Sequence, residues 1–201
     1  MIIWITGAAA VGKSTVTQLI KDKLLYHYSN LHYSGHDHEY TSKNGFKIPF
    51  STYGGKVMVV GRKGEGVLRG TDGVTRGIGR FKDFLHYEYF KWKPTFTPQI
   101  IVEGHKFISK PEMHDFLIKE NIKYKMYCLK VSRDEMDERS KKRGNGWDTK
   151  TRTPKVIDNQ LEEYNIVISK YKNNNNIEIR TSETKEQQEN IADEIIKDLK
   201  L

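Results

Sequence analysis

The sequence predicts an α/β protein in which a five-stranded parallel sheet is sandwiched by helices, and two observations predict it. Short apolar runs alternate along the chain with segments of helical periodicity, the pattern of buried parallel strands and their covering helices. The first apolar run leads through a glycine-containing turn directly into a helix, as in proteins built from alternating strands and helices. The 201 residues contain no repeat and no dividing linker, so we expect one domain over residues 1–201.

The first elements are expected around the N-terminal turn. IIWIT (residues 2–6) is a short buried strand, and LHYSG (31–35) is a second strand. Between them, a helix over 13–28 carries apolar side chains at core-facing spacing, namely Val16, Leu19, Ile20 and Leu24. This arrangement gives the first strand–helix–strand unit.

A β-hairpin is expected next, inside an insertion over about residues 45–73. Two β-rich pieces, around 46–53 and 56–62, are separated by Gly54-Gly55, which is typical of a hairpin turn. A helix from about 74 to 92 follows and ends before Pro94.

The remaining chain continues the alternation. QIIVEG (99–104) is an apolar strand that ends in an acid and a glycine, and Pro111 suits the first position of a helix over 111–121. The other expected elements are a strand at 124–131, helices at 133–143 and 154–172, a strand at 177–181, and a helix at 184–201 with Ile191, Ile195 and Leu199 on one face.

Charge is unevenly distributed along the chain, whose formal net charge is +8. Residues 54–82 hold seven Lys/Arg against two acidic residues, and residues 139–155 hold seven against one, whereas the tail from residue 173 is acidic. Two basic zones indicate an anionic partner, with phosphates as the first candidate. The alternative is a solvated surface from an A/T-rich genome that favours lysine codons.

The composition argues against a membrane protein and against a secreted protein. No apolar run approaches the ~20 residues of a membrane helix, and no signal peptide is visible before the first strand. The single cysteine, Cys128, excludes an internal disulfide and suits a reducing compartment. We therefore expect a cytoplasmic protein with no membrane partner.

GAAAVGKST (7–15) matches the phosphate-loop pattern G-x-x-x-x-G-K-[ST], directly after a strand and before a helix. Glycines let the backbone N–H groups point inward at phosphates, and the helix N-terminus adds its positive dipole end. Lys13 is expected to reach the β- and γ-phosphates and Ser14 to coordinate Mg²⁺. The expected ATP-binding residues are Gly7, Ala8, Ala9, Ala10, Val11, Gly12, Lys13, Ser14 and Thr15.

Glu103, at the end of the expected strand 99–104, is placed to hold Mg²⁺ through a water molecule beneath the phosphates. The alternative is a helix-capping or salt-bridging acid. No N-K-x-D motif occurs, and the aspartate of GTDG (70–73) comes too late for a GTPase switch, so ATP is the expected nucleotide. A motor ATPase would end this strand in an apolar run followed by Asp-Glu. The pattern resembles the small P-loop kinases of nucleosides, nucleotides and polynucleotide ends.

RSKKRGNGWDTKTR (139–152) fits the Arg-rich lid of such kinases. Arg139 and Arg143 are one helical turn apart and face the same way, and the glycines that follow supply a hinge. Their guanidinium groups would stabilise charge on the transferring phosphoryl group, so both arginines are catalytic candidates. The alternative is a solvated basic helix end. Trp147 in this lid is the best candidate to stack on an extruded base.

A kinase also needs a group that accepts or positions the proton of the acceptor hydroxyl. GHDHEY (35–40) follows the second expected strand at the sheet edge, which makes Asp37 the leading base and Asp72 its rival. His36 and His38 alternate as a metal pair would, but a third ligand is missing, so we expect no dedicated zinc site.

The acceptor site of P-loop kinases lies between the second and third strands, where this chain has VVGRKGEGVLRGTDGVT (59–75). Together with IIVEGHKF (100–107) and RSKKRG (139–144), this segment resembles the phage P-loop kinases that act on 5-hydroxymethyluracil in DNA during thymine hypermodification. The resemblance spans about residues 2–152. It implies a host-cytoplasmic enzyme that transfers the ATP γ-phosphoryl group to the 5-hydroxymethyl oxygen. It also implies acceptor contacts from Arg62, Thr71, Asp72 and Arg76, to which we add Arg69 as a further phosphate-gripping arginine.

Two other functions stay open. A deoxynucleoside monophosphate kinase of thymidylate type would need the same arginines for a free nucleotide. It normally shows a D-R-[YH] motif where this chain has EGHKF (103–107). The third possibility is an ATP-dependent nucleic-acid-binding switch, for which a water-excluding lid would be unnecessary.

Overall fold

The computed structural model describes residues 1–29, 36–41, 47–61, 77–92, 98–142, 154–171, 173 and 176–201. The strands are β1 (Ile2–Thr6), β2 (His36–Thr41), β3 (Lys47–Tyr53), β4 (Val57–Val60), β5 (Gln99–Glu103), β6 (Tyr124–Lys130) and β7 (Ile177–Thr181). The helices are α1 (Lys13–Ser29), α2 (Ile78–Trp92), α3 (Pro111–Lys119), α4 (Arg133–Lys142), α5 (Pro154–Tyr171) and α6 (Lys185–Asp198).

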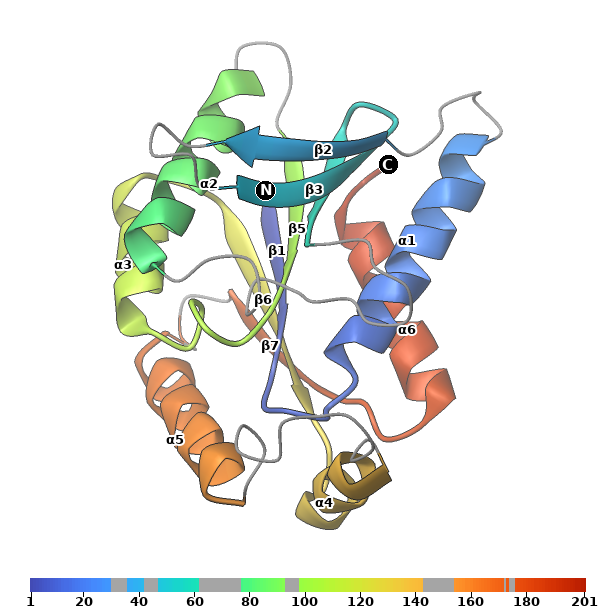
Figure 1. Cartoon of the computed structure of the whole chain (residues 1–201), viewed down its shortest axis with the longest axis vertical. Helices are drawn as coiled ribbons and strands as arrows, with labels where there is room; N and C mark the ends of the chain where they lie inside the picture. Colours follow the sequence, from blue (N-terminus) through green and yellow to red (C-terminus); the bar gives the residue numbers. More distant parts are fainter. Residues whose placement is uncertain are drawn as a thin grey trace.

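These strands form one sheet in the order β2-β3-β4-β5-β1-β6-β7. The five strands from β4 to β7 in this order are all parallel, which confirms the predicted parallel core. The strands β2 and β3 are antiparallel and form one edge of the sheet. All five parallel strands therefore present their carboxyl ends to the same edge of the molecule, the lower edge in Figure 1.

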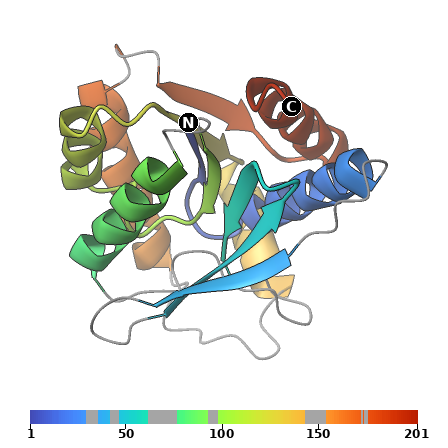
Figure 2. The same ribbon diagram turned by 90° about the horizontal axis from the view of Figure 1, so that it is seen from above.

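Helices cover both faces of the sheet, and the alternation of side chains along β1 shows how (Figures 1 and 2). Ile3 and Ile5 belong to one buried cluster, which also contains the apolar faces of α1 and α6. Ile2 and Trp4 point the other way into a second cluster, formed with α2, α3 and α5. Because successive side chains of a strand face opposite sides, a strand that is apolar throughout requires two such layers.

The predicted hairpin is present and is part of the sheet. Its two arms, β3 and β4, turn at Gly54 and Gly55, both with positive φ, as expected. Val60 of β4 pairs in parallel with Val102 of β5. The short strand β4 thus occupies the parallel position expected for residues 31–35, which lie outside the described residues.

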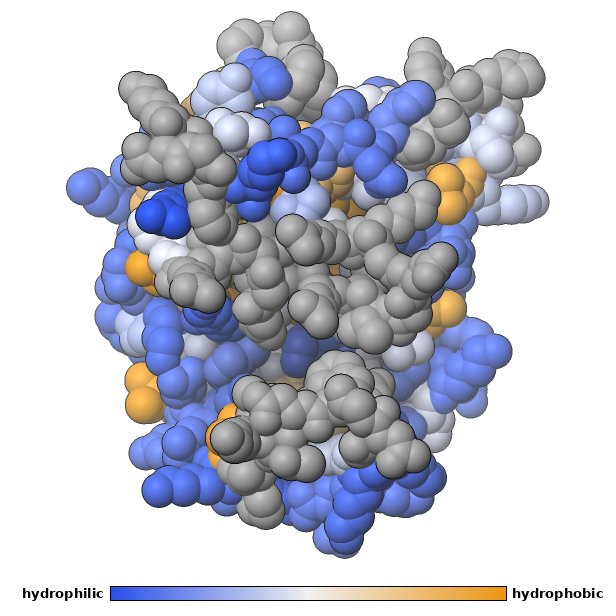
Figure 3. Space-filling view, in the orientation of Figure 1, coloured by the Kyte–Doolittle hydropathy of each residue, from blue (hydrophilic) through white to orange (hydrophobic). Residues whose placement is uncertain are grey.

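The surface of the described part carries few apolar side chains. Figure 3 shows hydrophilic residues over most of the coloured surface on this face, with hydrophobic residues scattered among them. No helix in the described ranges is long and apolar enough to cross a membrane.

Candidate nucleotide-binding site

The turn between β1 and α1 has a backbone that depends on glycine. Gly7 and Gly12 have φ angles of 140° and 92°, a region that L side chains rarely adopt. A Cβ atom at Gly7 would lie 2.5 Å from the carbonyl oxygen of Leu129, and one at Gly12 would lie 2.8 Å from Nε2 of Gln188. A side chain at Gly7 would therefore collide with the backbone of β6. At Gly12 the φ angle favours glycine, because the nearby Gln188 side chain could move away.

Lys13 folds back over this turn. Its Nζ donates hydrogen bonds to the carbonyl oxygens of Gly7 and Ala8, at 3.0 and 2.8 Å. The ammonium group thus lies at the turn that the N-terminus of α1 closes. A lysine and a helix N-terminus at one glycine-containing turn are groups that can bind phosphate.

Ser14 and Glu103 bring two oxygen donors to the same place. Ser14 Oγ donates to Oε1 of Glu103 at 3.3 Å, and Glu103 is only 5% exposed. The pairing of Ile5 with Glu103 places this carboxylate beside the end of β1. Hydroxyl and carboxylate oxygens are the ligands that Mg²⁺ prefers, so this donor set fits that ion.

The end of β5 is held firmly against β1. The N–H of Gly104 donates to the carbonyl oxygen of Ile5 at 3.1 Å, and the indole N–H of Trp4 donates to the carbonyl oxygen of Gly104 at 3.1 Å. Gly104 has a φ of 149°, which lets the chain turn away immediately after Glu103. These contacts fix the direction in which the Glu103 carboxylate leaves the sheet.

Helix α5 also contacts the phosphate loop. The N–H of Gly7 donates to the Tyr164 hydroxyl at 3.0 Å, and Gln160 Oε1 accepts a hydrogen bond from the N–H of Ala9 at 2.8 Å. Tyr164 also forms a short hydrogen bond with the Thr6 hydroxyl, and its own hydroxyl contacts the Gly7 carbonyl oxygen at 3.2 Å. Residues 160 and 164 are one helical turn apart, so one face of α5 supports the loop.

His105 and Glu163 extend this hydrogen-bond network from Tyr164 away from the loop. Nδ1 of His105 lies 2.9 Å from the Tyr164 hydroxyl, and its Nε2 lies 3.2 Å from Glu163 Oε2. Burial opposes ionisation of Glu163, but hydrogen bonds from Lys110 and Ser109 together hold its pKa below the ordinary value. A carboxylate that stays ionised orients His105, which in turn orients the Tyr164 hydroxyl.

Arg139 is placed at the outer side of the phosphate loop. Its guanidinium donates to the carbonyl oxygens of Ala10 at 3.4 Å, Ser182 at 3.2 Å and Glu183 at 2.6 Å. Its Nε donates to Glu135 at 2.5 Å. In this conformation Arg139 joins α4 to the loop and to the turn before α6. Arg143, the second lid arginine, and Trp147 lie outside the described residues.

Asp37 lies far from the phosphate loop, and its surroundings differ from the expectation. Residues 36–41 form the edge strand β2 themselves, whereas the sequence pattern predicts that they follow a strand. The register runs from Asp37 through Ser51, Val59 and Ile101 to Ile3. Asp37 is four strands away from β1. At about 4.8 Å between neighbouring strands, the distance across the sheet is roughly 19 Å.

The Asp37 carboxylate is engaged at that edge, where Oδ1 accepts a hydrogen bond from the Ser51 hydroxyl at 2.7 Å. Figure 1 shows β2 near the top of the view and the turn between β1 and α1 near the bottom. The structure therefore does not bring Asp37 to the phosphate loop.

The neighbouring histidines are not part of a metal cluster in the described residues. Nε2 of His38 is 2.9 Å from the Thr52 hydroxyl, and the rings of His36 and His38 are 6.5 Å apart. Among the residues that the structure describes, no group of three or more His, Cys, Asp or Glu side chains could hold a metal ion.

The predicted acceptor residues lie outside the described residues, but the point at which their segment leaves the sheet is described. Arg62, Arg69, Thr71, Asp72 and Arg76 belong to residues 62–76, directly after Gly61. Because Val60 pairs with Val102, the chain leaves β4 one strand from Glu103, at the carboxyl edge of the sheet. The segment thus starts beside the candidate Mg²⁺ ligand.

Three residues of the site were not identified from the sequence: His105, Gln160 and Tyr164. A signal for the first was its position two residues after Glu103. The other two are spaced i, i+4 on an expected helix, but nothing local shows which element that face contacts.

No protein-family model and no curated protein matches the sequence. The solved structures that are similar over nearly the whole chain include two kinases. One is a gluconokinase from Sinorhizobium meliloti 1021, which is 12% identical and has a TM-score of 0.43, covering 98% of this chain and 95% of that chain. The other is a deoxyadenosine kinase from M. mycoides, which is 14% identical and has a TM-score of 0.46, covering 98% of this chain and 99% of that chain.

Proposed function

We propose that this protein is a kinase that transfers the γ-phosphoryl group of ATP to a hydroxyl group, with Mg²⁺ as the metal ion. One observation carries the proposal: Lys13 and the Ser14–Glu103 pair meet at the carboxyl edge of the parallel sheet. A cationic lysine, a hydroxyl and a buried carboxylate at one phosphate-binding turn are the set that phosphoryl transfer from a nucleotide requires.

Each group has a separate task in this proposal. The Lys13 ammonium would leave the carbonyl oxygens of Gly7 and Ala8 and bind the β- and γ-phosphates, where it opposes their negative charge. Ser14 and Glu103 would hold Mg²⁺, directly and through water respectively. Bound Mg²⁺ neutralises charge on the phosphate oxygens. The acceptor oxygen then bonds to the γ-phosphorus, the bond to the β–γ bridging oxygen breaks, and ADP leaves.

The hydroxyl proton must go to a base, and Asp72 is favoured over Asp37 for this role. Asp37 is separated from β1 by four strand spacings and accepts a hydrogen bond from Ser51. Asp72 belongs to the segment that starts one strand from Glu103. A base has to lie within hydrogen-bond reach of the acceptor, which a side chain roughly 19 Å away does not.

The acceptor that we propose is the 5-hydroxymethyl group of 5-hydroxymethyluracil in DNA. Support comes from the resemblance of residues 59–75 and RGTDG (69–73) to the phage kinases of that base. The two basic zones support a polyanionic acceptor, because each lysine or arginine near a phosphate strengthens binding to DNA. A free deoxynucleoside monophosphate is the competing acceptor.

The experiment that tests the acceptor uses ATP labelled on its γ-phosphate and Mg²⁺. Three acceptors are compared at equal concentration: DNA containing 5-hydroxymethyluracil, ordinary DNA with 5′-hydroxyl ends, and thymidylate. We expect label on the first only. Label on thymidylate would instead identify a nucleotide kinase, and label on DNA ends a polynucleotide kinase. ATP binding without label on any of the three would favour a nucleic-acid-binding switch.

A further inference from the structure

Gln160 contacts the phosphate loop with only one half of its side-chain amide. Its Oε1 accepts a hydrogen bond from the N–H of Ala9 at 2.8 Å. Because a backbone N–H can only donate, the amide atom that faces it has to be the oxygen, and Nε2 is the other arm. Among the residues that the structure describes, none accepts a hydrogen bond from this Nε2, and the nitrogen is not buried. Gln160 therefore presents two N–H donors beside the loop.

The peptide group that Gln160 holds is also the one on which Lys13 rests. The carbonyl oxygen of Ala8 accepts a hydrogen bond from Nζ of Lys13 at 2.8 Å, and the N–H of Ala9 belongs to the same peptide group. Nε2 of Gln160 lies at most about 5 Å from the Ala9 nitrogen, because the oxygen and nitrogen of an amide are about 2.2 Å apart. An ammonium group that exchanges the Ala8 carbonyl for a phosphate oxygen needs to move by only about 3 Å. A phosphate bound by Lys13 would thus lie beside the peptide group at which Gln160 ends.

The other long polar side chain at this part of the loop is committed elsewhere. The Arg139 guanidinium donates to three backbone carbonyl oxygens, and its Nε donates to the Glu135 carboxylate. Arg139 would have to break these contacts to reach a phosphate. Gln160 can donate from Nε2 while its Oε1 stays on the Ala9 N–H, so in this conformation it is the donor that is already in place.

We propose that Gln160 is a substrate-contacting residue of this site, whose Nε2 donates a hydrogen bond to an oxygen of the γ-phosphate. The inference rests on the proposed function, in which Lys13 binds the β- and γ-phosphates. During transfer, negative charge is spread over the outer oxygens of the γ-phosphoryl group. A donor that is held in position by a second hydrogen bond stabilises this charge without having to reorganise. Because ADP lacks the γ-phosphate, the contact also distinguishes ATP from ADP.

Gln160→Glu separates this role from simple support of the loop. One carboxylate oxygen can still accept from the Ala9 N–H, but the other replaces the donor and repels the γ-phosphate. We expect the Kd for ATP to rise by about 10- to 100-fold, the effect of losing one hydrogen bond to a charged group, whereas the Kd for ADP should change little. The kcat of phosphoryl transfer should fall by about 10²-fold. The urea midpoint of unfolding should not fall.

Asn159→Asp is the matched control, because it makes the same change from amide to carboxylate at the exposed neighbouring position of α5. It should leave the ratio of the two Kd values unchanged. Equal weakening of ATP and ADP in Gln160→Glu would mean that Gln160 only shapes the loop, and unchanged ATP binding would mean that its amide does not face the γ-phosphate. Either result overturns the proposal. Both Kd values are measured without an acceptor, so a protein that transfers phosphate to no acceptor would refute the kinase function and leave this test intact.

A second measurement needs no variant. In the unchanged protein with ¹⁵N-labelled glutamine, the side-chain amide signal of Gln160 should shift with ATP and Mg²⁺ and shift much less with ADP and Mg²⁺. The signal of Gln18, on the exposed surface of α1, should stay in place with both nucleotides. Equal shifts of the Gln160 signal with ATP and with ADP would overturn the proposal, as would no shift with ATP.

Discussion

At the scale of single residues, Lys13 is the group on which the proposed phosphoryl transfer would depend most. Its Nζ is already at the phosphate turn, held by the carbonyl oxygens of Gly7 and Ala8. We expect Lys13→Ala to lower kcat by at least about 10³-fold, because an unopposed γ-phosphate loses several kcal/mol of transition-state stabilisation. The measurement is transfer of γ-label from ATP. Lys119→Ala, on the exposed surface of α3, is the matched control. Near-normal transfer by Lys13→Ala would rule out the kinase proposal.

His114 gives a residue-scale prediction about stability. The ring is fully buried, with Nε2 donating to the carbonyl oxygen of Ile108 at 2.8 Å and Nδ1 2.9 Å from the Tyr124 hydroxyl. Burial lowers the pKa of His114 from 6.5 to about 4. The unfolded chain therefore binds a proton more readily than the folded chain, and the free energy of unfolding falls as pH drops from about 6.5 towards 4. The total loss is about 3 kcal/mol.

The measurement is urea unfolding at pH 7, 5.5 and 4.5. His114→Gln should lower stability at pH 7 but remove most of this pH dependence, because glutamine does not titrate. His27→Gln, at an exposed position on α1, should keep the dependence of the unchanged protein. An equal slope in His114→Gln would assign the pH dependence to other groups.

At the scale of elements, α5 supports the phosphate loop through Tyr164. Removing its hydroxyl in Tyr164→Phe leaves the Gly7 N–H and the Thr6 hydroxyl without this partner in a buried place. We expect a loss of about 1–3 kcal/mol in the free energy of unfolding and weaker ATP binding, because a buried unpaired donor retains its desolvation cost. Urea unfolding and ATP titration measure the two effects. Tyr26→Phe, at a position 76% exposed on α1, should change neither, and the proposed support fails if Tyr164→Phe behaves the same way.

The glycine-rich segment gives a second prediction at this scale. Arg62→Ala and Arg69→Ala should each raise the KM for the nucleic-acid acceptor by about 10-fold, consistent with the loss of one charge-assisted hydrogen bond to phosphate. The Kd for ATP should change little. Equal losses of acceptor and ATP binding would show that this segment does not face the acceptor.

The elements that the sequence predicted well are those with strong local signals. The segments 99–103 and 177–181 are short apolar or alternating runs between helices, and both strands were placed to within a residue. The contacts of Gln160 and Tyr164 with the phosphate loop join residues 151 and 157 positions apart. No local pattern encodes such a contact. The edge strand β2 was missed because the residues of HDHEYT are polar except for Tyr40, so the segment lacks the alternating apolar face by which a strand is recognised.

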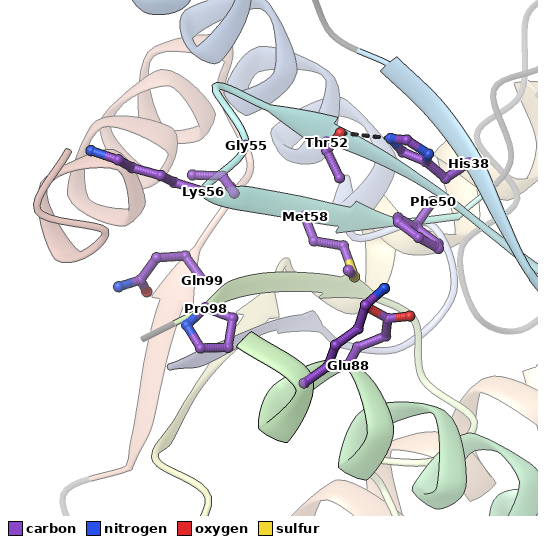
Figure 4. Close-up of a pocket in the computed structure, with 11 residues that line it drawn as sticks. His38, Phe50, Thr52, Gly55, Lys56, Met58, Glu88, Pro98 and Gln99 are labelled. Carbon is purple, nitrogen blue, oxygen red and sulfur yellow. Dashed lines mark hydrogen bonds between the residues drawn. The ribbon is translucent and has the colours of Figure 1, made fainter. Parts of the chain in front are cut away.

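At the scale of the whole molecule, the two ends of the sheet carry different features. The carboxyl ends of β1 and β5 carry the glycine turn and Glu103, whereas Val57 and Gln99, at the amino ends of β4 and β5, line a cavity between the hairpin and α2 (Figure 4). Open α/β sheets place their ligand sites at the carboxyl ends of the strands. The phosphate loop lies where this rule places it, and the sequence alone predicts that position. The cavity depends on how the hairpin packs on α2, which no single segment of the sequence specifies.

Cys128 reports on the opening of the whole molecule. It lies in β6, between β1 and β7, where it is paired with Thr6 directly before the phosphate loop, and it is 1% exposed. Burial raises the pKa of its thiol to about 11, so at neutral pH the thiol of the native protein is neither ionised nor accessible to a reagent.

We expect a disulfide reagent at pH 8 to label Cys128 only in molecules that have unfolded. ATP with Mg²⁺ at 100 times its Kd should slow labelling about 100-fold, because it binds only the folded state. Since Cys128 is the single cysteine, no other thiol contributes to the signal. Fast labelling of the native protein would mean that β6 opens locally. A labelling rate that ATP with Mg²⁺ leaves unchanged would mean that the nucleotide does not bind the folded protein.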